Sequence, residues 1–133
     1  MSGIIGLISV SAATPGAGEV QSIELRSSSD SRTRATGITP ASGKRIRIIA
    51  CQVHNNGSTE SQGQVYFGEG ADILTTPLNA ILMAVLQTDI NPDYGTSWPD
   101  GAGPVGDVDE VVSFKSDVDL ASDLYALIQW REE

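Results

Sequence analysis

The sequence predicts an all-β protein: a β-sandwich or jelly-roll-like domain with an extended N-terminal arm. Three observations favour this class. Several short segments carry β-branched and aromatic residues at strand spacing, turn-forming residues separate them, and no segment shows a clear helical period. The 133 residues suffice for one domain with its own core. No apolar run approaches the ~20 residues that span a bilayer, so we expect no membrane contact.

The chain divides into an arm and linker with short strands over residues 1–39 and a sandwich domain over residues 40–133. Residues 2–10 are apolar and strand-like, and residues 19–26 predict a short strand with Ile23 and Leu25 on one face. Between Arg26 and Ile38 the chain is polar, rich in serine and locally basic, with no core-forming residue. This composition is typical of a linker.

The best strand of the sequence runs from Lys44 to His54. Ile46 and Ile48 share one face, but the apolar positions then change parity at Ile49 and continue through Cys51 and Val53. A strand that changes parity is either buried on both faces or bulged. With residues 64–67, which resume strand character after a turn-rich segment, it predicts a β-hairpin with a long loop.

The second half of the chain predicts four further elements: an apolar segment, a long loop and two strands. Residues 77–87 form an apolar run that fits a helical segment or a buried strand, and the surrounding β segments favour the strand. Residues 89–110 contain prolines and glycines without periodicity and predict a long loop. Two strands close the chain, at 111–115 and at 123–130, and the second is apolar on both faces, as expected in the middle of a sheet or at an interface.

Charge is distributed unevenly along the chain. The net charge is −9, which argues against nucleic acid as a partner, because phosphate contacts need clustered Lys and Arg. Residues 1–59 hold six basic and three acidic side chains, whereas residues 60–133 hold two basic and fourteen acidic ones. The split suggests two parts with different neighbours, although an acidic, solvated surface explains it equally well.

Side chains suited to catalysis are scarce. His54 is the only histidine and is expected as a polar residue at a strand end, and the single Cys51 as a small buried hydrophobe. Asp107, Asp109 and Glu110 offer oxygen ligands but lack the order of an EF-hand, so a solvated acidic turn is favoured over a calcium site. The glycines of GAGPVG, residues 101–106, follow no predicted strand and open no helix, so their match to a dinucleotide-binding motif is chance. We expect no enzyme, cofactor or metal.

Four segments carry a resemblance to a known family. SGKRIRIIACQV, GQVYFGEG, TTPLNAILMAVLQ and a closing LYALIQW follow one another between residues 41 and 131. In this order they resemble the small decoration, or cement, proteins of phage heads, through pattern and without a diagnostic motif. The resemblance implies a β-sandwich on the outer surface of an icosahedral shell, commonly a trimer, with the major capsid protein and other copies of itself as partners.

Some members of this family have an N-terminal arm that reaches a neighbour, and the apolar, glycine-containing start of this chain fits such an arm, which leads to a hypothesis about its residues. An arm that adds a strand to a neighbouring subunit's sheet edge would bury apolar residues and carry basic ones: Ile4, Ile5, Leu7, Ile8, Arg26, Arg32 and Arg34. The alternative function is a receptor- or glycan-binding module of a fibre or cell surface, in which Tyr94 and Trp98 of the long loop would make the contact.

Overall fold

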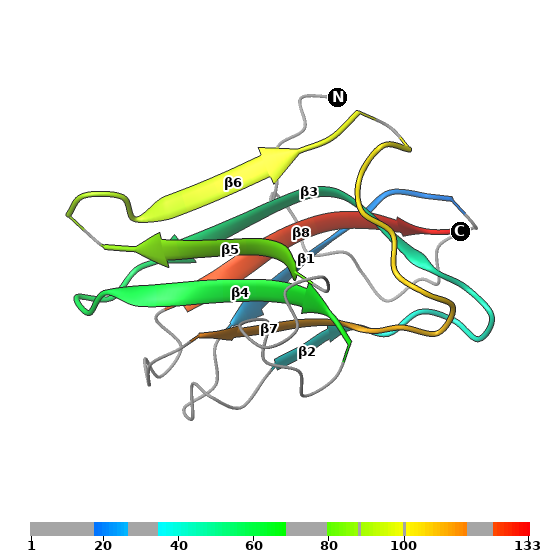
Figure 1. The fold of residues 1–133 in the computed structure, drawn as a ribbon, viewed down its shortest axis with the longest axis horizontal. Helices are drawn as coiled ribbons and strands as arrows, with labels where there is room; N and C mark the ends of the chain where they lie inside the picture. The colour runs from blue at the N-terminus through cyan, green and yellow to red at the C-terminus, as the bar shows by residue number, and fades with distance from the viewer. Residues whose placement is uncertain (1–17, 27–34, 69–79, 88, 100, 117–123) are drawn as a thin grey trace.

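The computed structural model describes residues 18–26, 35–68, 80–87, 89–99, 101–116 and 124–133. These residues form eight β-strands (Figure 1): β1 Gln21–Arg26, β2 Ala35–Ile38, β3 Ile46–Asn55, β4 Ser61–Phe67, β5 Ala80–Leu86, β6 Asp93–Ser97, β7 Val112–Ser116 and β8 Leu124–Glu132. No helix occurs in this described part. The predicted all-β class is confirmed.

The strands form two four-stranded antiparallel sheets that pack face to face. Sheet A has the order β1-β8-β3-β6 and sheet B the order β2-β7-β4-β5. Strands pair from the two ends of the chain inward: β1 with β8, β2 with β7, β3 with β6 and β4 with β5. This is the arrangement of a jelly roll, a long hairpin rolled into a two-layer sandwich. The predicted jelly-roll-like sandwich is therefore confirmed.

The parity change in β3 is a β-bulge. Ile48 lies opposite Trp130 of β8 and Ala50 opposite Gln129, so the extra residue Ile49 has no partner of its own in β8. Upstream of the bulge Ile46 and Ile48 face the core, and downstream Cys51 and Val53 do, all of them fully buried. The bulge lets one strand supply the core from both parities.

The core lies between the sheets and draws on seven of the eight strands. Val65 and Phe67 of β4 and Val112 and Phe114 of β7 share the buried face that their alternation predicted. β8 is central in sheet A, as its two-sided apolar pattern predicted, and residues 80–86 are a strand. The other core members are Leu25, Ile38, Ile46, Ile48, Cys51, Val53, Leu82, Leu86, Leu124, Ala126, Ile128 and Trp130.

Two sequence predictions were wrong. β3 and β4 do not form a hairpin, since β3 lies in sheet A and β4 in sheet B, and the turn between them crosses the sandwich. The expected loop 89–110 contains β6, whose polar sequence DYGTS shows no strand pattern. β6 forms because β3 would otherwise expose a row of unpaired N–H and C=O groups along residues 50–54.

β1 and β2 fall within residues 1–39, the part expected to be an arm and linker with short strands. Both are sheet members: β1 pairs with β8 along its whole length, and β2 pairs with β7. The rest of the predicted arm and linker, residues 1–17 and 27–34, lies outside the described residues, so the boundary at residue 39 stays a prediction.

The segment after β6 completes the edge of β3, and glycines permit this close approach. The N–H of Ile48 donates to the carbonyl of Pro104 (2.9 Å), and the N–H of Gly106 donates to that of Ile46 (3.0 Å). A Cβ at Gly103 would lie 1.9 Å from the carbonyl oxygen of Ile48. The GAGPVG segment is thus a packing motif that seals β3 upstream of its bulge.

Replacement of Gly103 by Ala should destabilise the fold. Because the new methyl group meets backbone, we expect a loss of about 1–3 kcal/mol in the free energy of unfolding, measured by urea denaturation. The neighbouring exposed Ala102 provides the control: Ala102→Ser should change it by less than about 0.5 kcal/mol. Equal stability of Gly103→Ala and the wild type would contradict the packing role.

Candidate functional site: an open apolar edge and a charged end

Cys51 and His54, the single cysteine and the single histidine of the chain, both lie in β3. Burial raises the pKa of the Cys51 thiol to about 12, so it stays protonated and inert, in line with its predicted role as a buried hydrophobe. His54 stacks against Tyr125 with ring centroids 5.1 Å apart, and its Nδ1 lies 3.5 Å from a carboxylate oxygen of Asp93. No group of three or more His, Cys, Asp or Glu side chains in the described part of the chain is placed to hold a metal ion.

The acidic turn at Asp107, Asp109 and Glu110 closes on the protein backbone. Asp109 accepts a hydrogen bond from the N–H of Gly43 (2.7 Å), and Glu110 accepts one from the N–H of Asp107 (2.9 Å). Asp109 has a left-handed φ of 65°, a conformation that aspartate tolerates better than most residues. The carboxylates of Asp109 and Glu110 thus accept backbone hydrogen bonds that stabilise this turn.

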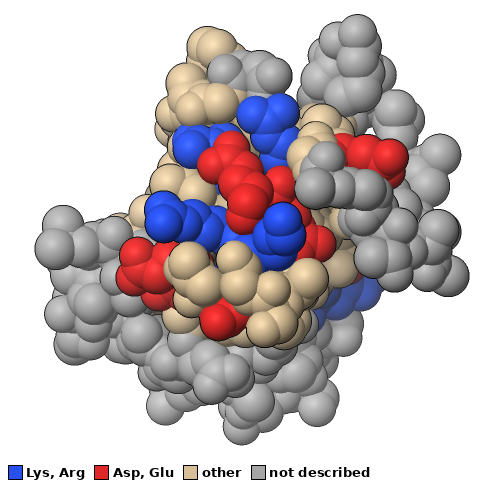
Figure 2. Space-filling model, turned by 90° about the vertical axis from the view of Figure 1, so that its right-hand side faces the viewer, with Lys and Arg blue, Asp and Glu red and all other residues tan. Residues whose placement is uncertain are grey.

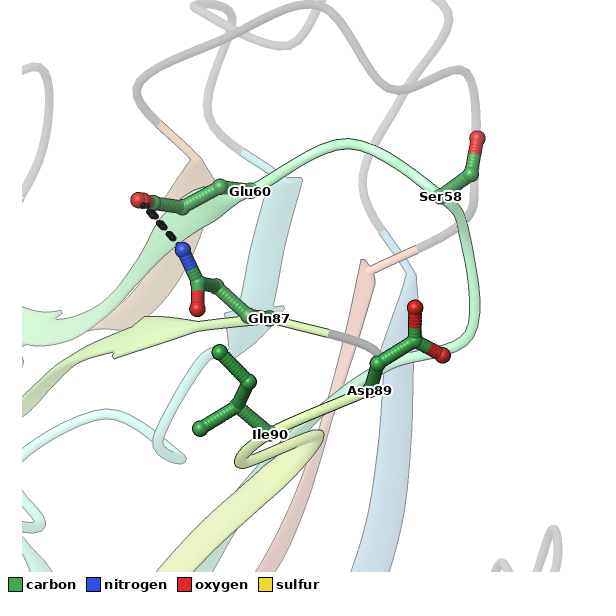
Figure 3. A pocket seen from close by; sticks show the side chains of 5 residues that line it. All are labelled: Ser58, Glu60, Gln87, Asp89 and Ile90. Carbon is green, nitrogen blue, oxygen red and sulfur yellow. Dashed lines mark hydrogen bonds between the residues drawn. The ribbon is translucent and has the colours of Figure 1, made fainter.

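A shallow pocket of about 200 Å³ lies where the β3–β4 turn meets the end of β5 (Figure 3). Glu60 occupies one side of it and accepts hydrogen bonds from the side-chain amide of Gln87 at 3.0 and 2.9 Å. Ser58, Asp89 and Ile90 complete the lining.

One end of the sandwich carries interleaved charges of both signs (Figure 2). Arg47 forms a two-point ion pair with Glu133, and its third nitrogen donates to the carbonyl of Gly103 (2.8 Å). Arg131 lies 3.8 Å from the same carboxylate, and Glu132 accepts from the N–H of Ala41 (2.9 Å). Basic residues of the first half of the chain therefore meet acidic residues of the second half. At this end of the sandwich the more basic first half of the chain and the acidic second half are in contact, so their opposite charges pair with each other.

Large exposed apolar side chains lie on β5 and β6, which are the free edges of their sheets, and on the turn that joins them. Met83 and Val85 of β5 are 44% and 51% exposed, Tyr94 of β6 is 53% exposed, and Ile90 in the turn between them is 77% exposed. We call these four residues the open apolar edge. Sequence reasoning found only Tyr94; the signal for β5 was an apolar run on both parities in a strand that can bury only one face.

The predicted contact residues lie in different places. Arg26 is in β1, where it pairs with Glu24 (2.9 Å) and stacks over the Tyr125 ring (4.8 Å). The Trp98 side chain is partly buried against the core, and the backbone N–H of Trp98 donates to the carbonyl of Ile49 at the bulge (3.0 Å). Of the two loop aromatics, Tyr94 alone is exposed. The remaining arm residues lie outside the described part of the chain: Ile4, Ile5, Leu7, Ile8, Arg32 and Arg34.

Comparison with known proteins gives the following. No protein-family model and no curated protein matches the sequence. Among solved structures, the chain is similar to one in the virus-like particle of extra small virus from the giant freshwater prawn Macrobrachium rosenbergii, with 8% identity, a TM-score of 0.45, and coverage of 91% of this chain and 83% of that chain. It is also similar to a chain of the capsid asymmetric unit of cyanophage Pam1, with 12% identity, a TM-score of 0.43, and coverage of 92% and 93%. At these scores the similarity carries no functional argument for this chain.

No helix of the described residues has the length and apolar character needed to cross a membrane.

The Glu133 carboxylate should make stability depend on pH. The hydrogen bond from Arg47 chiefly lowers the pKa of Glu133, aided by the charges of Arg47, Arg131 and Arg45 and opposed by burial. A lowered folded-state pKa adds stability above the unfolded value, and this gain is lost as pH falls through the folded value. Glu133→Gln should therefore reduce the free energy of unfolding at pH 7 by less than about 1 kcal/mol, because the pair is partly exposed.

Urea denaturation at a series of pH values measures this effect. The difference between wild type and Glu133→Gln should shrink in acid, where both side chains are neutral. Glu19→Gln, at an exposed position, is the matched control and should be neutral at every pH. A difference that persists unchanged in acid would contradict the electrostatic origin.

Proposed function

We propose that this chain is a structural protein of virus particles, a decoration or cement protein that binds the outer surface of an icosahedral shell and stabilises it through subunit contacts. The open apolar edge carries the proposal. Four large apolar side chains are exposed along β5, β6 and the turn between them, and exposed apolar surface on a small acidic protein marks places that bind other macromolecules. In this role the chain needs no enzymatic chemistry, cofactor or metal.

The sequence resemblance supports the same proposal. Its first three segments cover β3, β4 and β5, and its last covers β8. The resemblance thus follows the two inner strands of sheet A and half of sheet B. Jelly rolls serve viral capsid proteins, lectins and cupins alike, so the fold is compatible with a shell protein without selecting it.

The partners proposed are the major capsid protein and further copies of this chain, arranged as a homotrimer. The arm residues named above would make contacts to a neighbour. The net charge of −9 disfavours packaged nucleic acid as a partner and suits the outside of a shell.

Purified particles from the source of this gene test the proposal. We expect the protein to sediment with intact particles in a density gradient and an antibody raised against the folded chain to label their outer surface in electron microscopy. Adding the purified protein to particles stripped of it should raise the temperature at which they release their genome. Absence of the protein from particles, or its confinement to their interior, would refute the decoration role.

A receptor- or glycan-binding module is the second candidate, and the exposed ring of Tyr94 favours it. Trp98 would contribute little, because it packs against the core. Binding on a glycan array that Tyr94→Ala abolishes, with an unchanged melting temperature, would select this function over the first.

A further inference from the structure

The turn between β3 and β4 contains an Asn-Gly pair, the sequence most prone to spontaneous deamidation. Asn56 is followed by Gly57, whereas the other three asparagines of the chain are followed by Asn, Ala and Pro. Glycine favours the reaction because it has no side chain to hinder the approach of its own backbone nitrogen to the preceding amide. Asn56 is exposed, so water and hydroxide reach it. The sequence alone therefore makes Asn56 the first asparagine expected to deamidate.

The reaction begins with the loss of a proton from the backbone nitrogen of Gly57. Hydroxide takes this proton, and the nitrogen anion attacks Cγ of Asn56. The new N–Cγ bond closes a succinimide ring, the bond from Cγ to Nδ2 breaks, and Nδ2 leaves as ammonia after taking a proton from water. A water molecule then opens the ring at either carbonyl and leaves aspartate or isoaspartate. Both products add a negative charge, and isoaspartate also inserts a methylene group into the main chain.

In the folded protein the proton that must leave is held by the neighbouring side chain. The N–H of Gly57 donates to Oδ1 of Asn55 at 2.9 Å. A deprotonated nitrogen cannot donate, so this hydrogen bond stabilises only the unreactive form of the amide. The bond must break before the nitrogen can attack. The Asn55 side chain thus raises the barrier of the first step.

The other hydrogen bonds of Asn55 fix its amide in the protective orientation. Its Nδ2 donates to the carbonyl of Thr59 (2.8 Å) and to the carbonyl of Leu86 at the end of β5 (3.2 Å). Its backbone N–H donates to the carbonyl of Pro92 (2.7 Å), and the residue is fully buried. Turning the amide over would place an oxygen against two carbonyl oxygens. Oδ1 therefore faces Gly57.

We propose that Asn55 protects the Asn56–Gly57 pair from deamidation. The turn that it protects runs beside the end of β5 (Figure 3) and carries the chain from sheet A to sheet B. An isoaspartate at position 56 would lengthen this crossing and move Gly57 away from Oδ1 of Asn55. The protection is independent of what the chain binds, so it goes beyond the proposed function and stands or falls separately from it.

Deamidation rates of the full-length chain test the proposal. Wild type and Asn55→Ala are incubated at mildly alkaline pH, and peptide mapping by mass spectrometry measures aspartate and isoaspartate at position 56. We expect Asn55→Ala to deamidate about fivefold faster, the factor that corresponds to the loss of one ordinary hydrogen bond. Equal rates in samples that remain folded would overturn the proposal.

Ser58→Gly is the matched control for flexibility of the turn. Ser58 is exposed in the same turn, and its replacement by glycine loosens the backbone while Asn55 and the N–H of Gly57 remain. We expect a smaller acceleration of deamidation than in Asn55→Ala. An acceleration as large as that of Asn55→Ala would show that rigidity of the turn controls the rate and would refute the role of Asn55.

Amide hydrogen exchange of the wild type tests the same bond without relying on the folding of Asn55→Ala. We expect the N–H of Gly57 to exchange at least about fivefold more slowly in the folded protein than in the urea-unfolded chain, although it lies in a surface turn. Deamidation at Asn56 should be slowed in the folded protein in the same way. A Gly57 amide that exchanges equally fast in both states would contradict the protection.

Discussion

The hydrogen bonding of β3 is the constraint on which the rest of the structure depends. β3 is a ten-residue inner strand of sheet A, and its backbone must be satisfied on both sides. β8 supplies one side throughout. The other side is divided at the Ile49 bulge, with β6 downstream and the segment around Pro104 upstream. Bulge, short polar strand and glycine segment are therefore parts of one solution to a single pairing problem.

This constraint explains how far the sequence could predict the fold. Strands rich in apolar residues, such as β7 with its alternation and β8 with apolar residues on both parities, were located because side-chain burial fixes their pattern. The parity change at Ile49 likewise predicted a bulge or two-sided burial, and β3 contains the bulge. β6 could not be predicted, because its residues pair with the backbone of β3 and supply no side chain to the core. The hairpin of β3 and β4 failed because a turn-rich segment does not reveal whether the chain turns within a sheet or crosses to the other.

The candidate site was predictable to a similar degree. The scarcity of catalytic groups and the burial of Cys51 followed from composition and pattern, and Tyr94 was named together with Trp98 as an aromatic residue of an expected loop. Trp98 was not distinguishable from Tyr94, since both share the parity that faces the core, and only the extent of sheet B decides which ring is covered. The apolar run of β5 was recognised as a strand, but its position at an edge is a property of the topology.

The same fold explains where the charges of the two halves of the chain meet. The jelly roll brings the start of β3 beside the end of β8, so Arg47 and Glu133, 86 residues apart, neutralise each other. Arg47 of this pair also donates to the carbonyl of Gly103 and so holds the segment that pairs with the start of β3. In contrast, β5 and its surroundings expose apolar side chains to solvent. A small acidic protein that retains an uncharged, unblunted edge accepts a risk of aggregation. Contact with another macromolecule along this edge, as in the proposed function, would remove that risk and would give a physical reason for keeping the edge apolar.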